Sequence, residues 1–313
     1  MKPPLISICI PTFNRPDLCI RAIKSALNQD YANFEVVVSD NSDNHNKRKL
    51  ELFCKNKNDL KYKQTPSKLS MSENWDNVVN LSSGEYFLLL SDDDYFTFPD
   101  SVSKFSKQID KSSHGFIFSN VVIEKNEKKF FRKHTRNKIF KTDELLRHHY
   151  IRNFPIFPCS TLVKRSDFNN IGGYTNFSTD FAVDAELWIR LLDKYDSAKY
   201  LAEPLVTYFS HSSISNNHPD IWKKDIKKID ILCSNLRNIS NETAKLLANT
   251  FKKELNFIDI YNEYKSIVTN LKATKIHKLI YPAFNIFRLI IKHKIFSFSL
   301  GKVKARYFDS NRF

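Results

Sequence analysis

Two kinds of apolar pattern alternate along the first 95 residues of the chain. Short uninterrupted apolar runs, typical of strands covered on both faces, occur at residues 5–11, 34–39 and 85–90. Between them, apolar residues recur at helical spacing over residues 15–29, 46–56 and 71–81. The order strand, helix, strand, helix, strand predicts an open α/β sheet whose strands run mostly parallel.

Polar clusters follow these predicted strands at residues 12–15, 40–42 and 92–94. Ligands of open α/β sheets bind outside the carboxyl ends of the strands, so we expect the three clusters to meet in one pocket. The chain has only five glycines and contains neither the Gly-x-Gly-x-x-Gly pattern nor the Walker pattern. This absence disfavours a dinucleotide-dependent oxidoreductase and a P-loop NTPase.

The third cluster consists of three consecutive aspartates, Asp92, Asp93 and Asp94. Like charges at this spacing oppose one another's ionisation unless a cation compensates them. A set of oxygen ligands suits Mg²⁺ or Mn²⁺, which could neutralise the charge that builds on a departing diphosphate. A solvated turn or a helix cap is the alternative interpretation.

The other two clusters favour a nucleotide. Asp40 is placed to accept hydrogen bonds from a base or ribose, and the turn of Pro11, Thr12, Phe13 and Asn14 offers an aromatic face and polar tips. Phe13 considered alone is more typical of a core residue. Together the three strand ends predict a pocket for a nucleoside diphosphate and its metal.

Four segments then carry a family resemblance: ISICIPTFNRPDLCIRAIKSALNQDYANFEVVVSDNSDN, SSGEYFLLLSDDD, GGY and VDAELWIRLL. In order and separation they resemble the inverting glycosyltransferases of family two, of the bacterial surface-polysaccharide type, over about residues 4–215. The resemblance implies a GT-A fold: an α/β, Rossmann-like, mixed but mostly parallel sheet flanked by helices. It also implies transfer of a sugar from a nucleotide diphosphate sugar to a hydroxyl group, with inversion at the anomeric carbon.

The resemblance also implies roles for single residues. It places the nucleotide sugar at Pro11, Thr12, Phe13, Asn14, Arg15, Asp40 and Asp92, the last as a ribose contact. Asp93 falls at the position of the metal ligand for Mn²⁺ or Mg²⁺, with Asp94 as an additional or alternative ligand. Ser91 departs from the commonest family spelling, Asp-x-Asp-Asp, which leaves open which carboxylate binds the metal.

An inverting displacement needs a carboxylate that takes the proton of the attacking hydroxyl. Asp184 matches the aspartate of the family's Glu-Asp motif, although Val183 replaces the glutamate, and Glu186 is the fallback base. Without the resemblance, both would be ordinary acidic residues in the first turn of a helix. His211 lies in a segment that resembles the family's Tyr-Arg-x-His motif, and could reach the diphosphate or the metal; a structural histidine is the alternative.

Three further side chains are candidates for the donor or acceptor pocket. Asn74 and Trp75 precede the acidic strand, and Trp75 and Trp188 could stack on a sugar face, although each tryptophan is more typical of a core. Gly172 and Gly173 predict a tight turn before the acceptor loop, because glycine permits positive φ.

The net charge of +15 is concentrated at the carboxyl end. Residues 264–313 carry eleven Lys and Arg residues against Asp309 alone, so a protein that binds nucleic acid along its whole surface is disfavoured. We expect a catalytic domain at residues 1–217 and a basic helical extension at residues 218–313. An apolar stripe at helical spacing from Ile276 to Ile291 would let this extension lie on an anionic membrane surface, or else pack on the catalytic domain.

The sequence therefore predicts a metal-dependent glycosyltransferase that uses a UDP-sugar and a lipid-linked glycan acceptor, in the synthesis of a surface polysaccharide such as an O-antigen or capsule. No transmembrane helix or signal peptide is expected, which favours a cytoplasmic protein that is peripheral to the membrane. Two alternatives stay open. One is a sugar-phosphate nucleotidyltransferase, and the other is a non-catalytic module that binds a polyanion or a membrane.

Overall fold

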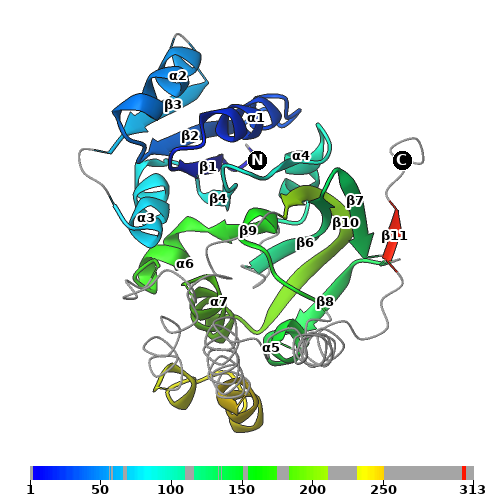
Figure 1. Ribbon diagram of the computed structural model, residues 1–313. Coiled ribbons are helices and arrows are strands. Elements are labelled where there is room, and N and C mark those ends of the chain that lie inside the picture. Colours follow the sequence, from blue (N-terminus) through cyan, green and yellow to red (C-terminus); the bar gives the residue numbers. More distant parts are fainter. Residues whose placement is uncertain are drawn as a thin grey trace, which may run out of the picture.

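The computed structural model describes residues 3–55, 57, 59–65, 69–109, 116–132, 134, 136–150, 154–174, 183–210, 231–249 and 305–307. Its main feature is one mixed sheet with the strand order β11-β7-β6-β9-β4-β1-β2-β3, to which β5, β8 and β10 are joined. Helices lie on both sides of this sheet, with α1 and α2 on one side and α3, α6 and α7 on the other (Figure 1).

The amino-terminal half of the sheet is parallel. It contains β1 (Ile6–Thr12), β2 (Phe34–Asp40), β3 (Leu60–Gln64) and β4 (Tyr86–Leu89). The register pairs Thr12 with Asp40, so the polar residues that follow these strands come to the same edge. The order reverses between β1 and β4, which is the switch point where open α/β sheets bind ligands. The predicted parallel sheet is confirmed, and β3 is an additional strand.

Three helices connect these strands: α1 (Pro16–Leu27), α2 (Asn44–Cys54) and α3 (Met71–Leu81). The bounds of α3 match the predicted helix because its first turn carries a capping box. The Glu73 N–H donates to Ser70 Oγ (3.2 Å), and the Ser70 N–H donates to Glu73 Oε2 (2.8 Å).

The second half of the sheet is mixed. Strand β9 (Thr161–Lys164) follows the short helix η1 (Pro158–Ser160) and runs antiparallel to both β4 and β6 (Phe116–Lys125). Strand β10 (Ser197–Phe209) lies parallel to β6, with register shifts between Leu201 and Val206. It also pairs antiparallel with β5 (Tyr95–Phe96) and β8 (Lys138–Lys141). This pairing with β5 brings the end of β10 beside the acidic cluster.

The remaining elements are α4 (Ser101–Ser106), β7 (Lys128–Arg132), α5 (Thr142–Tyr150), α6 (Arg165–Asn170), α7 (Val183–Lys194) and β11 (Ala305–Tyr307). Residues 125–141 contain β7 and β8, two strands that the sequence analysis does not predict. Both strands pair with longer ones: β7 with β6 and β8 with β10.

The core has two parts, one on each face of the sheet. Along β1 the side chains alternate, so that Ile8 and Ile10 belong to the cluster that includes α1, whereas Cys9 belongs to the cluster that includes α3 and α7. The five cysteines are free and buried.

Residues 231–249 pack onto the second of these clusters through Cys233, Ile239 and Leu247, each at most 5% exposed. Asp193 of α7 accepts hydrogen bonds from the backbone of residues 237–239, and Asp143 of α5 accepts hydrogen bonds from Ser240 and Thr243. The domain boundary after residue 217 stays a prediction. Among the described helices, none has the length and apolar character needed to cross a bilayer.

Candidate active site

The site begins where β1 and β4 end. Thr12 Oγ1 donates a hydrogen bond to Asp92 Oδ2 (2.8 Å), and both side chains are buried. The Phe13 N–H also donates to the Asp92 carboxylate. The first and third polar clusters of the sequence therefore meet at the switch point of the sheet.

Arg15 joins two of the three aspartates. Its Nη1 atom lies 3.2 Å from Asp92 Oδ1 and 2.8 Å from Asp93 Oδ2. Because both oxygens contact one guanidinium nitrogen, they lie close enough together to share a single cation. The side chain of Arg15 is 37% exposed, whereas those of Asp92 and Asp93 are 8% and 15% exposed.

Asp94 points elsewhere. Its carboxylate is buried, accepts a hydrogen bond from the Phe209 N–H (2.9 Å) and contacts the Cys159 thiol. It therefore ties the acidic turn to the end of β10 and to η1.

The negative charges of this cluster favour a bound cation. Burial raises the pKa of Asp92 to about 6, although Arg15 opposes the shift. Burial and the neighbouring Asp93 raise the pKa of Asp94 well above its ordinary value. Arg15 thus faces two of the three carboxylates, and carboxylate oxygens are ligands that Mg²⁺ and Mn²⁺ prefer. Within the described residues no group of three or more His, Cys, Asp or Glu side chains could hold a metal ion. Mg²⁺ often uses only one or two carboxylates and completes its shell with water and phosphate.

On the nucleotide side, Asp40 is fully buried and accepts hydrogen bonds from the Ser42 N–H (2.9 Å) and from Tyr62 Oη (2.7 Å). Asn14 has a φ of 57° and bonds across to the loop after β2, where its N–H donates to Ser42 Oγ (2.8 Å). Phe13 is 41% exposed beside them. An exposed aromatic ring above a rigid turn is suited to stacking on a base, and the predicted nucleotide contact at Phe13 stays a prediction.

Asp184, the predicted base, stands in the first turn of α7. Its Oδ1 accepts a hydrogen bond from the Ala185 N–H (2.8 Å), and burial raises the pKa of its carboxyl group. Glu186, the predicted fallback base, is buried and holds Arg190 with both oxygens, one at 2.6 Å. The Glu186 carboxylate therefore forms an ion pair with Arg190, and its role as the fallback base stays a prediction.

The other predicted pocket residues are mostly structural. Trp188 is 2% exposed and packs edge-to-face on Phe116 at 5.5 Å, so its predicted place on a sugar face is wrong. Asn74 is buried, donates to the Thr12 carbonyl (3.2 Å) and accepts from Ser39 Oγ (2.6 Å), so it joins the ends of β1 and β2. Trp75 is partly buried and contacts Tyr174 at 5.2 Å.

Two residues that the sequence-based prediction omits lie at this site. The Arg21 guanidinium rests over the rings of Tyr95 (4.7 Å) and Phe209 (4.8 Å) and donates to the Asp93 carbonyl (2.5 Å). Burial, followed by Asp94, Cys159, Asp93 and Asp184, raises the pKa of Tyr208. The negative charges of the acidic cluster and of Asp184 therefore both act on the phenol of Tyr208. Tyr208 is the first residue of the segment that resembles the Tyr-Arg-x-His motif, and this is the signal that the sequence offers for it.

His211 and residues 264–304 are outside the described residues.

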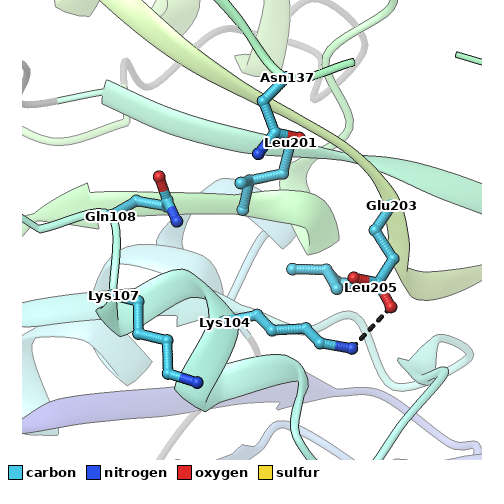
Figure 2. Close-up of a pocket in the computed structure, with 7 residues that line it drawn as sticks. All are labelled: Lys104, Lys107, Gln108, Asn137, Leu201, Glu203 and Leu205. Carbon is cyan, nitrogen blue, oxygen red and sulfur yellow. Dashed lines mark hydrogen bonds and ion pairs between the residues drawn. The ribbon is translucent and has the colours of Figure 1, made fainter. Parts of the chain in front are cut away.

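A cavity of about 120 Å³ lies between α4 and β10. The Lys104–Glu203 ion pair (2.6 Å) crosses it, and Gln108 and Leu205 line it (Figure 2). None of its lining residues belongs to the carboxylate site.

Comparison with known proteins identifies the class of transferase to which this fold and site belong. The chain belongs to glycosyltransferase family 2, because the family model described as Glycosyl transferase family 2 matches residues 7–172, more than half of its length. A glucosyltransferase of Campylobacter jejuni, named GalNAc(5)-diNAcBac-PP-undecaprenol beta-1,3-glucosyltransferase, is 26% identical over 90% of this chain and 91% of its own. The putative colanic acid biosynthesis glycosyl transferase WcaA of Escherichia coli is 34% identical over 37% of this chain and 42% of its own.

Solved structures show the same fold. S. aureus TarS 1-349, in complex with UDP-GlcNAc, superposes with a TM-score of 0.64 at 15% identity and covers 80% of this chain and 72% of its own. The mannosyltransferase PcManGT from Pyrobaculum calidifontis, in complex with GDP-Man and Mn²⁺, superposes with a TM-score of 0.60 at 12% identity over 96% and 84%. The predicted GT-A fold and the predicted glycosyltransferase activity are confirmed, and the two alternative functions are set aside.

Proposed function

We propose that this chain transfers a sugar from a nucleoside diphosphate sugar, specifically a UDP-sugar, to a hydroxyl group of a lipid-linked glycan, with inversion at the anomeric carbon. The observation that carries the proposal is the acidic cluster at the β1/β4 switch point, held by Thr12 and Arg15. Support for the lipid-linked acceptor comes from the name of the Campylobacter relative, and support for the donor class comes from the ligands of TarS and PcManGT. Synthesis of a surface polysaccharide is the process that such an acceptor favours.

In this proposal each group of residues has its own role. Asp93, with Asp94 or Asp92, would hold Mn²⁺ or Mg²⁺, which stabilises the negative charge of the departing diphosphate when bound. Phe13 and the turn around it bind the nucleotide. Asp184 accepts the proton of the acceptor hydroxyl as its oxygen attacks the anomeric carbon and the bond to the diphosphate oxygen breaks. The raised pKa of Asp184 suits a proton acceptor better than an ordinary carboxylate would.

The test compares two carboxylates of one helix. Asp184→Asn is expected to lower turnover at least about 10³-fold, while the affinity for UDP in the presence of Mn²⁺, measured by calorimetry, stays unchanged. Glu186→Gln is the matched control, because glutamine keeps an oxygen that can accept from Arg190, and it should retain most of the turnover. Full activity in Asp184→Asn would refute the assignment of the base.

The proposal places the protein at the cytoplasmic face of the membrane, where a lipid-linked acceptor is available. Residues 264–313, with eleven cationic side chains, would bind anionic headgroups. Deleting them should release the protein from anionic vesicles in a sedimentation assay, and unchanged sedimentation would rule out the anchor.

A further inference from the structure

The turn that leaves α6 is formed by two glycines. Gly172 and Gly173 have φ values of 85° and 69°, and their N–H groups donate to the carbonyls of Asn169 (3.0 Å) and Phe168 (3.1 Å). The left-handed conformation ends the helix and turns the chain toward α7. Residues 171–174 are held from both sides, by α3 and by α7.

On the α3 side, Asp76 holds the turn. Its Oδ1 accepts a hydrogen bond from the Tyr174 N–H (2.9 Å). A β-carbon on Gly173 would lie 2.7 Å from the same oxygen, so the close approach requires glycine. Burial raises the pKa of Asp76 to about 6, against the opposing effects of the Tyr174 N–H and Arg190. A half-buried carboxylate with this backbone partner makes a specific contact.

On the α7 side, Arg190 holds the same turn. Its Nη1 donates to the Ile171 carbonyl (2.7 Å) and its Nη2 donates to the Gly173 carbonyl (2.8 Å). Glu186, one turn earlier on α7, pairs with the same guanidinium and fixes its orientation. Asp184 lies in the first turn of this helix.

Helix α3 links this turn to the nucleotide end of the sheet. Asn74, two residues before Asp76, bonds to Thr12 and Ser39 at the ends of β1 and β2. Hydrogen bonds therefore join α3 to the end of β1 at Asn74 and to the glycine turn at Asp76, and they join that turn to α7 at Arg190. Figure 1 shows α3, α6 and α7 following one another on the same side of the sheet.

We infer that Asp76 is a positioning residue for Asp184: with Arg190 it clamps the Gly172–Gly173 turn between α3 and α7, and so sets where Asp184 stands relative to the donor. The inference rests on the proposed role of Asp184 as the base. Asp76 itself contacts the turn and touches no reacting atom. Its effect should appear in the rate of transfer and leave nucleotide affinity unchanged, because misplacement of a reacting group by about 1 Å can cost about 10²-fold.

The test uses Asp76→Ala and Asp76→Asn in the full chain. Asp76→Ala should lower kcat about 10- to 100-fold at saturating donor and leave the affinity for UDP with Mn²⁺ unchanged. It should also speed amide hydrogen exchange at Tyr174 and in the first turn of α7. Asp76→Asn retains an oxygen that accepts from the Tyr174 N–H, and should bring kcat back to within about fivefold of wild type.

Asp167→Ala is the matched control. Asp167 is another half-buried carboxylate, and it accepts from Tyr195 Oη (2.6 Å) and contacts Lys194 Nζ (3.0 Å) at the far end of α7. Equal losses of kcat in Asp167→Ala and Asp76→Ala, or unchanged exchange at Tyr174 in Asp76→Ala, would overturn the inference. A fully active Asp184→Asn variant would instead overturn the assignment of the base, so the two failures are distinguishable.

Discussion

At the scale of single residues, the surroundings of Asp184 determine the pH range in which it can act as a base. Burial raises its pKa, and hydrogen bonds from the backbone at the start of α7 reduce the shift. A base must be ionised to accept a proton, so activity is expected to fall as the pH drops through this raised value.

The acid limb of kcat/KM should therefore lie above pH 3.8, the ordinary value for an aspartate. The profile is measured at saturating Mn²⁺, so that protonation of the metal-binding carboxylates does not contribute. Glu186→Gln should leave the limb in place, since that carboxylate is paired with Arg190. An acid limb at the ordinary value would mean that Asp184 is solvated in the active protein.

At the scale of elements, the two glycines after α6 both have positive φ, but they differ in the atoms that a β-carbon would contact. Nothing lies within 4 Å of a β-carbon on Gly172, so Gly172→Ala should cost only the backbone strain, about 1–2 kcal/mol. Gly173→Ala adds a contact with Asp76, which must move and release the Tyr174 N–H, for about 1 kcal/mol more.

The extra cost of Gly173→Ala over Gly172→Ala can be isolated by a double-mutant cycle measured with equilibrium urea unfolding. In an Asp76→Ala background the extra cost of Gly173→Ala over Gly172→Ala should disappear, because the oxygen that clashes is gone. A difference that persists there would place its origin in the backbone alone.

The individual elements also show which features of the fold and the site can be predicted from the sequence. Helix α3 was predicted to the residue because its apolar spacing and its Ser70–Glu73 capping box are both local signals. Strand β8 was missed because only Phe140 of its four side chains is buried, and its pairing partner, β10, lies far along the chain. The acidic cluster was found because three charges follow an apolar strand. Helical spacing placed Glu186 and Trp188 on α7, but their partners Arg190 and Phe116 depend on tertiary packing.

At the scale of the whole molecule, the position of residues 231–249 bears on where the catalytic unit ends. Cys233, Ile239 and Leu247 are buried in the same core cluster as α7. Removing these three side chains would cost the free energy that their burial contributes to stability, on the order of 5 kcal/mol. Asp143 and Asp193 would also lose their hydrogen-bond partners in this segment. A chain cut at the predicted boundary therefore leaves part of its core uncovered.

We expect a chain ending at residue 217 to unfold at a clearly lower temperature than one ending at residue 249, and to bind UDP with Mn²⁺ only at lower temperatures. In the uncut chain, Leu247→Ala should reproduce part of the loss, about 2–5 kcal/mol, because Leu247 is fully buried. Thermal unfolding followed by circular dichroism measures both effects. If the two truncated chains unfolded at the same temperature, the boundary after residue 217 would separate independent units, and the contacts of Asp143 and Asp193 with the segment would contribute nothing to the stability of the catalytic domain.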